Sequence, residues 1–404
     1  MGAGSVTFSA RMKFVQLCLT LLFWFWIMPA KVLAADRGKQ SLDKAKVEFL
    51  NRYAETLEAE YADSWELGRL LQKKVEEFLE KPSAEALTAA REAWINCREP
   101  YDQSEVGRFY DGPIENIEGL INAWPIDENY IDYTLAAPNS GIINDELDFP
   151  QITREVILGA NEKEGKKTVS TGFHAIEYLL WGQDLYVDSP GRRSYLDYVE
   201  STAGPGRRAG RRRQYLHLLV DLLVQHLQIL ANEWAPHQPT NYRARFLALP
   251  PDQALTKVFA GLGNFSSAEL SGERLLVPYA TKSQENEQSC FSDTTHLDLL
   301  RNEIGIQDVC LGSYPSISGV AVHGQGLIAL LEAANPKLAA KLQNQLEITV
   351  AALKAIPPPF DQAILGDDSK PGRVAIKKCL DALQAQNAML AEAAEVLHIR
   401  LNLK

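Results

Sequence analysis

Residues 42–80 read LDKAKVEFLNRYAETLEAEYADSWELGRLLQKKVEEFLE, with apolar side chains at three- and four-residue spacing among many Glu and Lys. Apolar residues at this spacing fall on one face of an α-helix, so the segment predicts a long amphipathic helix. The turn Lys81-Pro82-Ser83 follows it. Ser83 is a suitable N-cap for a second helix, which we expect from Ala84 to about Arg108.

The same period recurs toward the C-terminus. It predicts helices over 207–235, which Pro236 ends, from about Pro336 to Ala355, and from Val374 to Leu401. No run of strict alternation is long enough to indicate a sheet, so the predicted class is all-α.

The length of 404 residues exceeds what one ordinary core accommodates, which favours two helical-bundle domains. We expect domains over 35–240 and 241–404, divided in the proline-rich segment 236–251. The tetrad Pro100-Tyr101-Asp102-Gln103 recurs as Pro359-Phe360-Asp361-Gln362, which suggests that the domains arose by duplication.

The N-terminus is typical of a secretory signal peptide. Arg11 and Lys13 precede an apolar run over 14–28, and Val32-Leu33-Ala34 offers small residues for cleavage. We therefore expect a signal peptide over 1–34 and export to the periplasm or cell envelope. An uncleaved signal would instead attach the chain to the cytoplasmic membrane.

The composition is that of a globular protein, with 46% hydrophobic and 23% charged residues. The net charge of −11 argues against nucleic acid as a partner, because a negative surface repels phosphate. One basic cluster is expected to form a solvated face or to contact an anionic membrane surface. It comprises Arg192, Arg193, Arg207, Arg208, Arg211, Arg212 and Arg213.

Beyond the signal, the cysteines are Cys97, Cys290, Cys310 and Cys379, without a CxxC pair. In an exported protein, Cys290 and Cys310 can form a disulfide across a modest loop. Four buried thiols are the alternative, and the sequence leaves both open.

The segment Thr171–Gly182, TGFHAIEYLLWG, places His174 and Glu177 three residues apart. On a helix this spacing brings both side chains to one face, where imidazole and carboxylate can bind one metal ion such as zinc or iron. A structural histidine is the alternative, since this spacing also arises by chance.

A second set of polar residues lies on the helix predicted after Ser83. Trp94, Arg98, Tyr101 and Glu105 share one stripe of that helix. Glu105 is the natural third metal ligand, while Arg98 and Tyr101 can orient a carboxylate or bind an anion beside the metal. An internal salt bridge of Arg98 with Glu105 or Glu177 is the alternative.

The second half of the chain offers further candidates for the same cleft. Glu269 and Glu273 lie one helical turn apart, and Asp293 and His296 repeat the acid–imidazole spacing in reverse order. Asp293 can equally cap a helix through the backbone of Thr295 and His296, which is the interpretation we favour. The sequence contains no HExxH, GxSxG or phosphate-binding loop motif.

Together these motifs resemble the imelysin-like family, which is also classed as a peptidase family, and within it the iron-regulated protein A branch. The resemblance covers roughly residues 42–400. The motifs are Gly172-x-His174-x-x-Glu177 followed by Tyr-Leu-Leu-Trp-Gly, Ala93-Trp94 with Arg98 and Tyr101, Asn122-Ala123-Trp124-Pro125-Ile126-Asp127, Gly272-Glu273-Arg274, and Ser289-Cys290-Phe291-Ser292-Asp293-x-Thr295-His296. The resemblance implies two duplicated all-helical domains with a site near their interface that contains His174 and Glu177. It also implies an envelope location and a link to iron uptake, as in the related EfeO proteins.

We therefore expect an exported metal-binding protein that serves iron acquisition, with an envelope transport partner. Ferric iron is hard and would favour carboxylate ligands and Tyr101. One alternative is a zinc metallopeptidase, in which Glu177 or Glu105 acts as base and Arg98 binds the substrate carboxylate. The other is a module that recognises a ligand or partner without metal.

Overall fold

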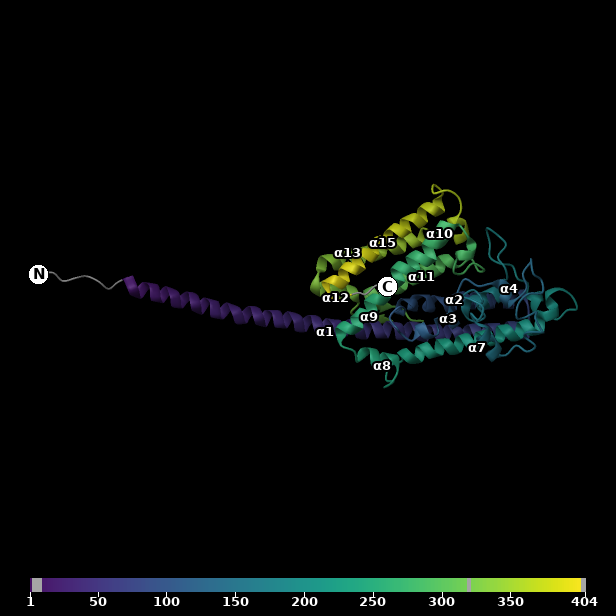
Figure 1. Ribbon diagram of the computed structural model, residues 1–404, viewed down its shortest axis with the longest axis horizontal. Coiled ribbons are helices and arrows are strands. Elements are labelled where there is room, and N and C mark those ends of the chain that lie inside the picture. The colour runs from purple at the N-terminus through teal and green to yellow at the C-terminus, as the bar shows by residue number, and fades with distance from the viewer. Residues whose placement is uncertain (2–8, 318–320, 401–404) are drawn as a thin grey trace.

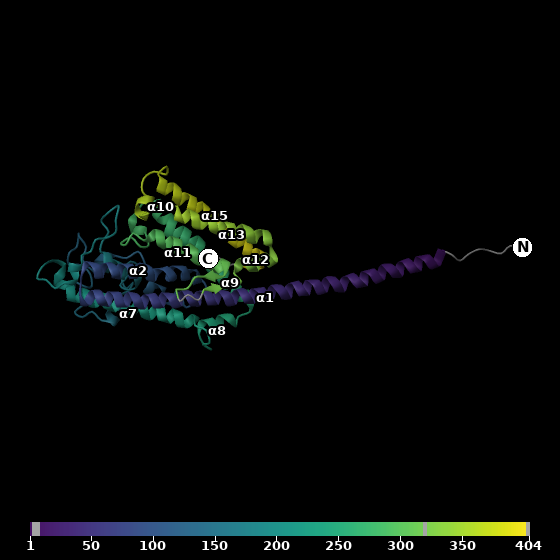
Figure 2. The same cartoon turned by 180° about the vertical axis from the view of Figure 1, so that it is seen from behind.

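The computed structural model describes residue 1, residues 9–317 and residues 321–400; side chains are described for residue 1 and from Gln40 onward. The first helix, α1 (Ser9–Glu80), confirms the helical pattern of residues 42–80 and continues N-terminally beyond the body of the molecule (Figures 1 and 2). The predicted signal peptide falls on residues 2–8, which lie outside the described residues, and on part of α1 without described side chains. Within the part searched, no helix has the length and apolar content needed to cross a membrane.

Nearly all regular structure is helical, which confirms the all-α prediction. The first half contains α2 (Ala84–Ser104), η1 (Glu105–Gly107), η2 (Ile114–Asn116), α3 (Glu118–Ile121), α4 (Glu128–Ile131), α5 (Arg154–Ala160), α6 (Gly172–Trp181), η3 (Tyr195–Tyr198), η4 (Gly204–Arg208) and α7 (Ala209–Trp234). The second half contains α8 (Tyr242–Leu247), α9 (Pro251–Asn264), the π-helical η5 (Phe265–Leu276), α10 (Val277–Thr281), η6 (Gln284–Asn286), α11 (Thr295–Leu311), α12 (Leu327–Ala334), α13 (Pro336–Lys354), α14 (Phe360–Ile364) and α15 (Pro371–Val396). The short strands β1 (Ser313–Tyr314) and β2 (Val322–His323) pair antiparallel. Each has only two residues, which is too short to produce a recognisable alternation of polar and apolar residues in the sequence.

The helices pack in layers against the C-terminal part of α1 (Figures 1 and 2). Helices α2 and α7 lie against α1, α11 packs on α2, and α13 and α15 cover α11 (Figures 1 and 2). The buried apolar side chains of these layers form one continuous cluster. The α2–α11 contact therefore joins the two halves of the chain through a shared core, while the boundary at 240/241 and the duplication remain predictions.

Local helix signals are reproduced in the structure. The Ser83 hydroxyl accepts a hydrogen bond from the backbone N–H of Ala86 at 3.2 Å, as expected of an N-cap. Helix α2 ends at Ser104, earlier than the predicted Arg108, and Glu105 begins a 3₁₀ turn. Glu105 consequently lies beyond the helix that carries Arg98.

Three arginines of the basic cluster contradict the expected solvated face. Arg193 and Arg212 are buried around Asp132, whose Oδ2 lies 2.7 Å from Arg193 Nη1 and 2.7 Å from Arg212 Nε. The Arg211 guanidinium donates to backbone carbonyls of the loop before α5, including Ile143 and Phe149, at 2.7 Å. Arg211 is held here because the irregular loop leaves backbone carbonyls that need hydrogen-bond donors. Arg193 and Arg212 are held by their ion pairs with Asp132.

Of the two possibilities left open for Cys290 and Cys310, the structure excludes the disulfide, because the described cysteines are all free thiols. Cys290 precedes helix α11 and Cys310 lies at its C-terminal end, and the 17 residues of this helix span about 25 Å. A disulfide requires Cα atoms within about 7 Å. The alternative of buried thiols holds for Cys97, Cys310 and Cys379, while Cys290 is half-buried.

Candidate functional site

Helix α6 carries the GxHxxE motif through the interior, and all ten of its residues are buried. Gly172 begins the helix with φ +83°, a conformation that side chains other than glycine rarely adopt. A Cβ at this position would lie 2.4 Å from the carbonyl oxygen of Ile121. The glycine of the motif thus lets α6 approach the end of α3 closely, and this contact positions His174 and Glu177.

The side chains of His174 and Glu177 meet as their spacing predicted. His174 Nδ1 lies 2.8 Å from Glu177 Oε2. The other carboxylate oxygen, Oε1, accepts hydrogen bonds from the Ser292 backbone N–H at 2.9 Å and from its hydroxyl at 2.7 Å. His174 Nε2 is buried and has no hydrogen-bond partner among the described residues. One nitrogen of the imidazole is therefore held, and the other is available.

Burial controls the protonation of this pair. Burial lowers the pKa of His174 well below its usual value, and the nearby Arg98 guanidinium lowers it further. Burial also raises the pKa of Glu177 to about 8, although the bonds from Ser292 oppose that change. The imidazole is consequently neutral, and when Nδ1–H donates to Glu177 the Nε2 atom carries a lone pair.

Arg98 is buried beside α6 and pairs with acids other than those predicted. Its Nη2 lies 2.8 Å from Asp102 Oδ1, its Nε lies 3.1 Å from Asp298 Oδ1, and its Nη1 donates to Asn122 Oδ1 at 2.8 Å. The alternative of an internal salt bridge for Arg98 is therefore confirmed, but its partners are Asp102 and Asp298 instead of Glu105 or Glu177.

The two aromatic residues of the predicted polar stripe, Trp94 and Tyr101, pack against α6. Trp94 donates its indole N–H to the carbonyl of Phe173 at 2.9 Å, and the ring of Tyr101 lies 5.2 Å from the ring of Phe173. The Tyr101 hydroxyl is buried and, within the described part of the chain, has no hydrogen-bond partner. Tyr101 thus supplies a second buried polar atom without a partner on the face that packs against α6.

Glu105 is bound by arginines. Both of its oxygens lie 2.7 Å from Arg274 nitrogens, and Arg108, Asn122 and Asn302 donate to them at 3.0–3.2 Å. Burial alone would raise the pKa of Glu105, but Arg274 and Arg108 lower it to about 2. Within the described chain, Glu105 is not close enough to His174 and Glu177 for ligand atoms of all three residues to lie within 4.8 Å of one another. The structure therefore places the predicted third ligand in an ion pair with Arg274, a residue that the site prediction omitted although it stands in the Gly272-Glu273-Arg274 motif.

Glu269 and Glu273 line a cavity of about 560 Å³ beside this ion pair. Glu269 accepts hydrogen bonds from Arg274 and Arg108, whereas Glu273 is exposed. The remaining lining residues include Glu118, Asn122, Trp124, Glu162 and Lys166. The predicted cleft thus exists for these two glutamates, but neither His174 nor Glu177 lines it.

Asp293 belongs to a separate acidic group with Asp184 and Asp361. One carboxylate oxygen from each of the three lies within 4.8 Å of the others. The expected helix cap is wrong: α11 has no side-chain cap bond, and Asp293 Oδ2 is buried without a partner in the described chain. Asp293 adopts φ +56°, which differs from the extended backbone of an N-cap residue.

The pKa values in this acidic group are raised. Burial and then the neighbouring acids raise the pKa of Asp293 to about 7, and mainly burial raises the pKa of Asp184 to about 6. His296, the last predicted ligand, is half-buried in the first turn of α11 and is not a member of the group. The tetrad that contains Asp361 was the only available sequence signal for this group, and nothing in the sequence indicated Asp184.

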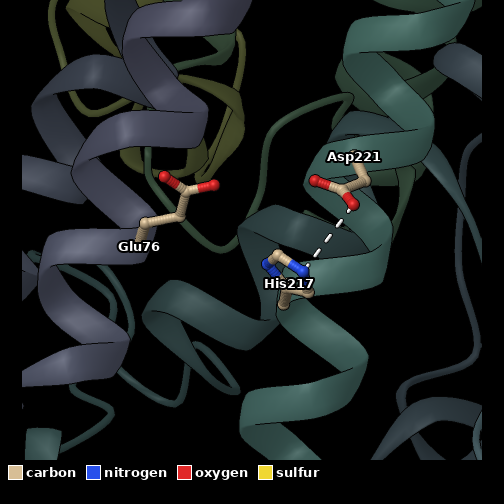
Figure 3. A group of neighbouring side chains, drawn as sticks. All are labelled: Glu76, His217 and Asp221. Atoms are coloured by element: carbon tan, nitrogen blue, oxygen red, sulfur yellow. Dashed lines mark ion pairs between the residues drawn. The ribbon is translucent and has the colours of Figure 1, made fainter.

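A further group joins Glu76 of α1 to His217 and Asp221 of α7 (Figure 3). His217 Nε2 lies 3.7 Å from Asp221 Oδ2, but Arg154 Nη2 lies 3.6 Å from the same oxygen. Glu76 and His217 are exposed. Because Arg154 already compensates the charge of Asp221, we interpret this group as a surface ion-pair network.

Comparisons with known proteins agree with the sequence motifs. The model of the Imelysin family (Peptidase_M75) matches residues 57–390. Iron-regulated protein A from Synechococcus elongatus is 27% identical over 331 residues, which cover 80% of this chain and 76% of that protein. The crystal structure of a protein described as an iron-regulated protein A precursor, from Parabacteroides distasonis, superposes with a TM-score of 0.67 at 18% identity. That match covers 88% of this chain and 95% of the other, and it shows that the fold is shared.

Proposed function

The chain belongs to the imelysin family, and from that premise we propose that it binds iron at His174, which Glu177 holds in orientation, and serves iron acquisition in the cell envelope. The relative from Synechococcus elongatus is named for its regulation by iron, which supports the choice of metal. The proposed location rests on the signal-like N-terminus, and the proposed partner is an envelope transport protein that receives the iron.

The observation that carries this proposal is the unpartnered Nε2 of His174. A buried polar atom left without a partner costs about 1–3 kcal/mol, and a metal bound to Nε2 would remove that cost. Glu177 holds the opposite nitrogen at 2.8 Å, an arrangement that orients metal-binding histidines in many proteins. The residues therefore fit a metal that approaches Nε2.

One candidate oxygen ligand adjoins helix α6. Tyr101 packs against Phe173, the residue before His174, and its hydroxyl lacks a partner among the residues described. A phenolate oxygen suits ferric iron. Glu105 would have to exchange its contacts with Arg274 before it could join, so we rank it behind Tyr101.

Peptidase chemistry receives less support from the geometry. A hydrolytic zinc site needs about three protein ligands, an open position for water, a general base and access for a peptide. Both oxygens of Glu177 are already engaged, by His174 and Ser292. Neither His174 nor Glu177 lines the 560 Å³ cavity that could admit a peptide.

Metal titration of the full chain tests the proposal. We expect one iron per chain by elemental analysis and calorimetry, with binding lost in His174→Ala and weakened in Glu177→Gln. His226→Ala is the matched control, because His226 is also a buried histidine, on α7. A preference for zinc, with metal-dependent peptide cleavage lost in Glu177→Gln, would favour the peptidase, and no metal binding by the unchanged chain would exclude both metal functions.

A further inference from the structure

The acidic group around Asp293 draws on three segments that are far apart in the sequence. Asp184 follows α6, Asp293 precedes α11, and Asp361 lies on α14. Their nearest ligand oxygens all fall within 4.8 Å of one another. Such a convergence of like charges does not follow from any helical period, so the tertiary fold itself brings these residues together.

The carboxylates form no ion pair within the described part of the chain, although the charge of Arg192 acts on Asp184 and lowers its pKa. Across residues 40–317 and 321–400, no Lys, Arg or His side chain forms an ion pair with any of the three. The hydrogen bonds they accept come from neutral groups: the Tyr186 backbone N–H and the Gln284 amide for Asp184, and the Gln362 backbone N–H for Asp361. Ordinary hydrogen bonding therefore leaves the repulsion between these acids uncompensated.

Unpartnered buried oxygens provide a second, independent indication of a ligand. Asp293 is only 9% exposed, and its Oδ2 has no partner in the described chain. Glu287 is 2% exposed, its Oε1 is also unpartnered, and its strongest charge interactions are with Asp361 and Asp293. A fourth carboxylate thus adjoins the same group with one oxygen free, although Thr295 forms a hydrogen bond with its side chain.

A bound cation resolves both features at once. It neutralises the acids and supplies a partner to the free oxygens, and buried charges in proteins are normally paired or bound to metal. Because the donors are all carboxylate oxygens, the ion must be hard, since soft ions require sulfur or nitrogen ligands.

We propose that Asp184, Asp293 and Asp361, with Glu287 beside them, form a second cation site that takes a hard, oxygen-preferring ion such as Ca²⁺ or Mn²⁺ and is separate from the His174–Glu177 pair. The ion ties the loop after α6 to α14 and to the loop before α11. Ser292, the neighbour of Asp293, donates both of its hydrogen bonds to Glu177, so the two sites share one loop. Occupancy of the acidic site therefore stabilises the orientation of Glu177.

The test is calorimetric titration of the full chain with Ca²⁺ and with Mn²⁺. We expect one ion per chain, with affinity reduced by at least about tenfold in Asp293→Asn and Asp361→Asn. Asp148→Asn is the matched control, because Asp148 is an exposed acid outside this group and should leave affinity unchanged. His174→Ala should also leave it unchanged, which separates this site from the proposed iron site.

Thermal unfolding keeps the test decisive if a variant binds no ion. Without added metal, Asp361→Asn should be at least as stable as the unchanged chain, because one repelling charge is removed. Added Ca²⁺ or Mn²⁺ should raise Tm clearly more in the unchanged chain than in Asp361→Asn. The proposal is overturned if the unchanged chain binds neither ion, if the Asn variants bind as tightly as it does, or if His174→Ala abolishes the binding.

Discussion

Replacing Glu303 by glutamine tests how strongly a buried, uncompensated carboxyl group opposes this fold at high pH. Glu303 lies on α11, is 0% exposed, and accepts one hydrogen bond, from the Gln386 side-chain amide of α15 at 3.0 Å. Its other oxygen, Oε1, lacks a partner in the described chain, and so does Gln386 Oε1. Burial raises the pKa of Glu303 from 4.5 to about 8.

The sign of the effect follows from linkage. Because the folded pKa lies above the unfolded pKa, the native state holds its proton more tightly. The associated stability is complete below about pH 4.5 and is lost as the pH rises through about 8. A shift of about 3.5 units at about 1.4 kcal/mol per unit gives an upper limit of about 5 kcal/mol lost above pH 8. Local relaxation reduces this limit, so we expect about 2–4 kcal/mol.

Glu303→Gln removes this penalty and can donate an N–H to the free Gln386 Oε1. The assay is urea unfolding followed by circular dichroism at pH 5, 7 and 9. We expect the variant to match the unchanged chain at pH 5 and to exceed its stability by about 2–4 kcal/mol at pH 9. Glu392→Gln, an exposed site on α15, is the control and should show no such trend. A difference that does not vary with pH, or a variant that is less stable at pH 9, would refute the reasoning.

Two further substitutions test the architecture around the motif. Gly172→Ala places a Cβ 2.4 Å from the Ile121 carbonyl at φ +83° and should cost about 2–4 kcal/mol in thermal unfolding, whereas Gly159→Ala, where a Cβ meets nothing within 4 Å, should cost little. Arg274→Met removes the bidentate partner of Glu105 and should cost about 3–5 kcal/mol at pH 7. Because the pKa of Glu105 is lowered to about 2, this cost should shrink as the pH falls below about 4.5 toward 2, and denaturant unfolding that gives equal costs at pH 7 and pH 3 would contradict the assignment.

Local periodicity predicted the helices and the His174–Glu177 contact, because both depend on residues within a few positions of each other. The Ser83 cap and the α6 helix are of this kind. The sequence was a poor guide to polar partners. Arg98 pairs with Asp298 across two packed helices, and Arg274 reaches Glu105 from another segment. Such pairs depend on which helices pack together, and no spacing along the chain encodes that.

The same limit explains the misjudged surface features. Arg193 and Arg212 belong to a run of arginines typical of a solvated face, but Asp132, some 60 to 80 positions away, draws both into the interior. Asp293 stands at the position of a helix cap, yet its backbone turns the carboxylate toward Asp184 and Asp361. In both cases the sequence suggests a common local role, but the contacts of the side chain are with residues far away in the sequence.

The most direct test of the central claim is iron binding by the full chain, measured beside His174→Ala and His226→Ala. The account predicts one iron per chain, bound equally by the unchanged chain and by His226→Ala. Binding should be lost in His174→Ala, because the unpartnered Nε2 of His174 is the proposed metal ligand. Iron bound equally by His174→Ala, or not bound by the unchanged chain, would contradict it.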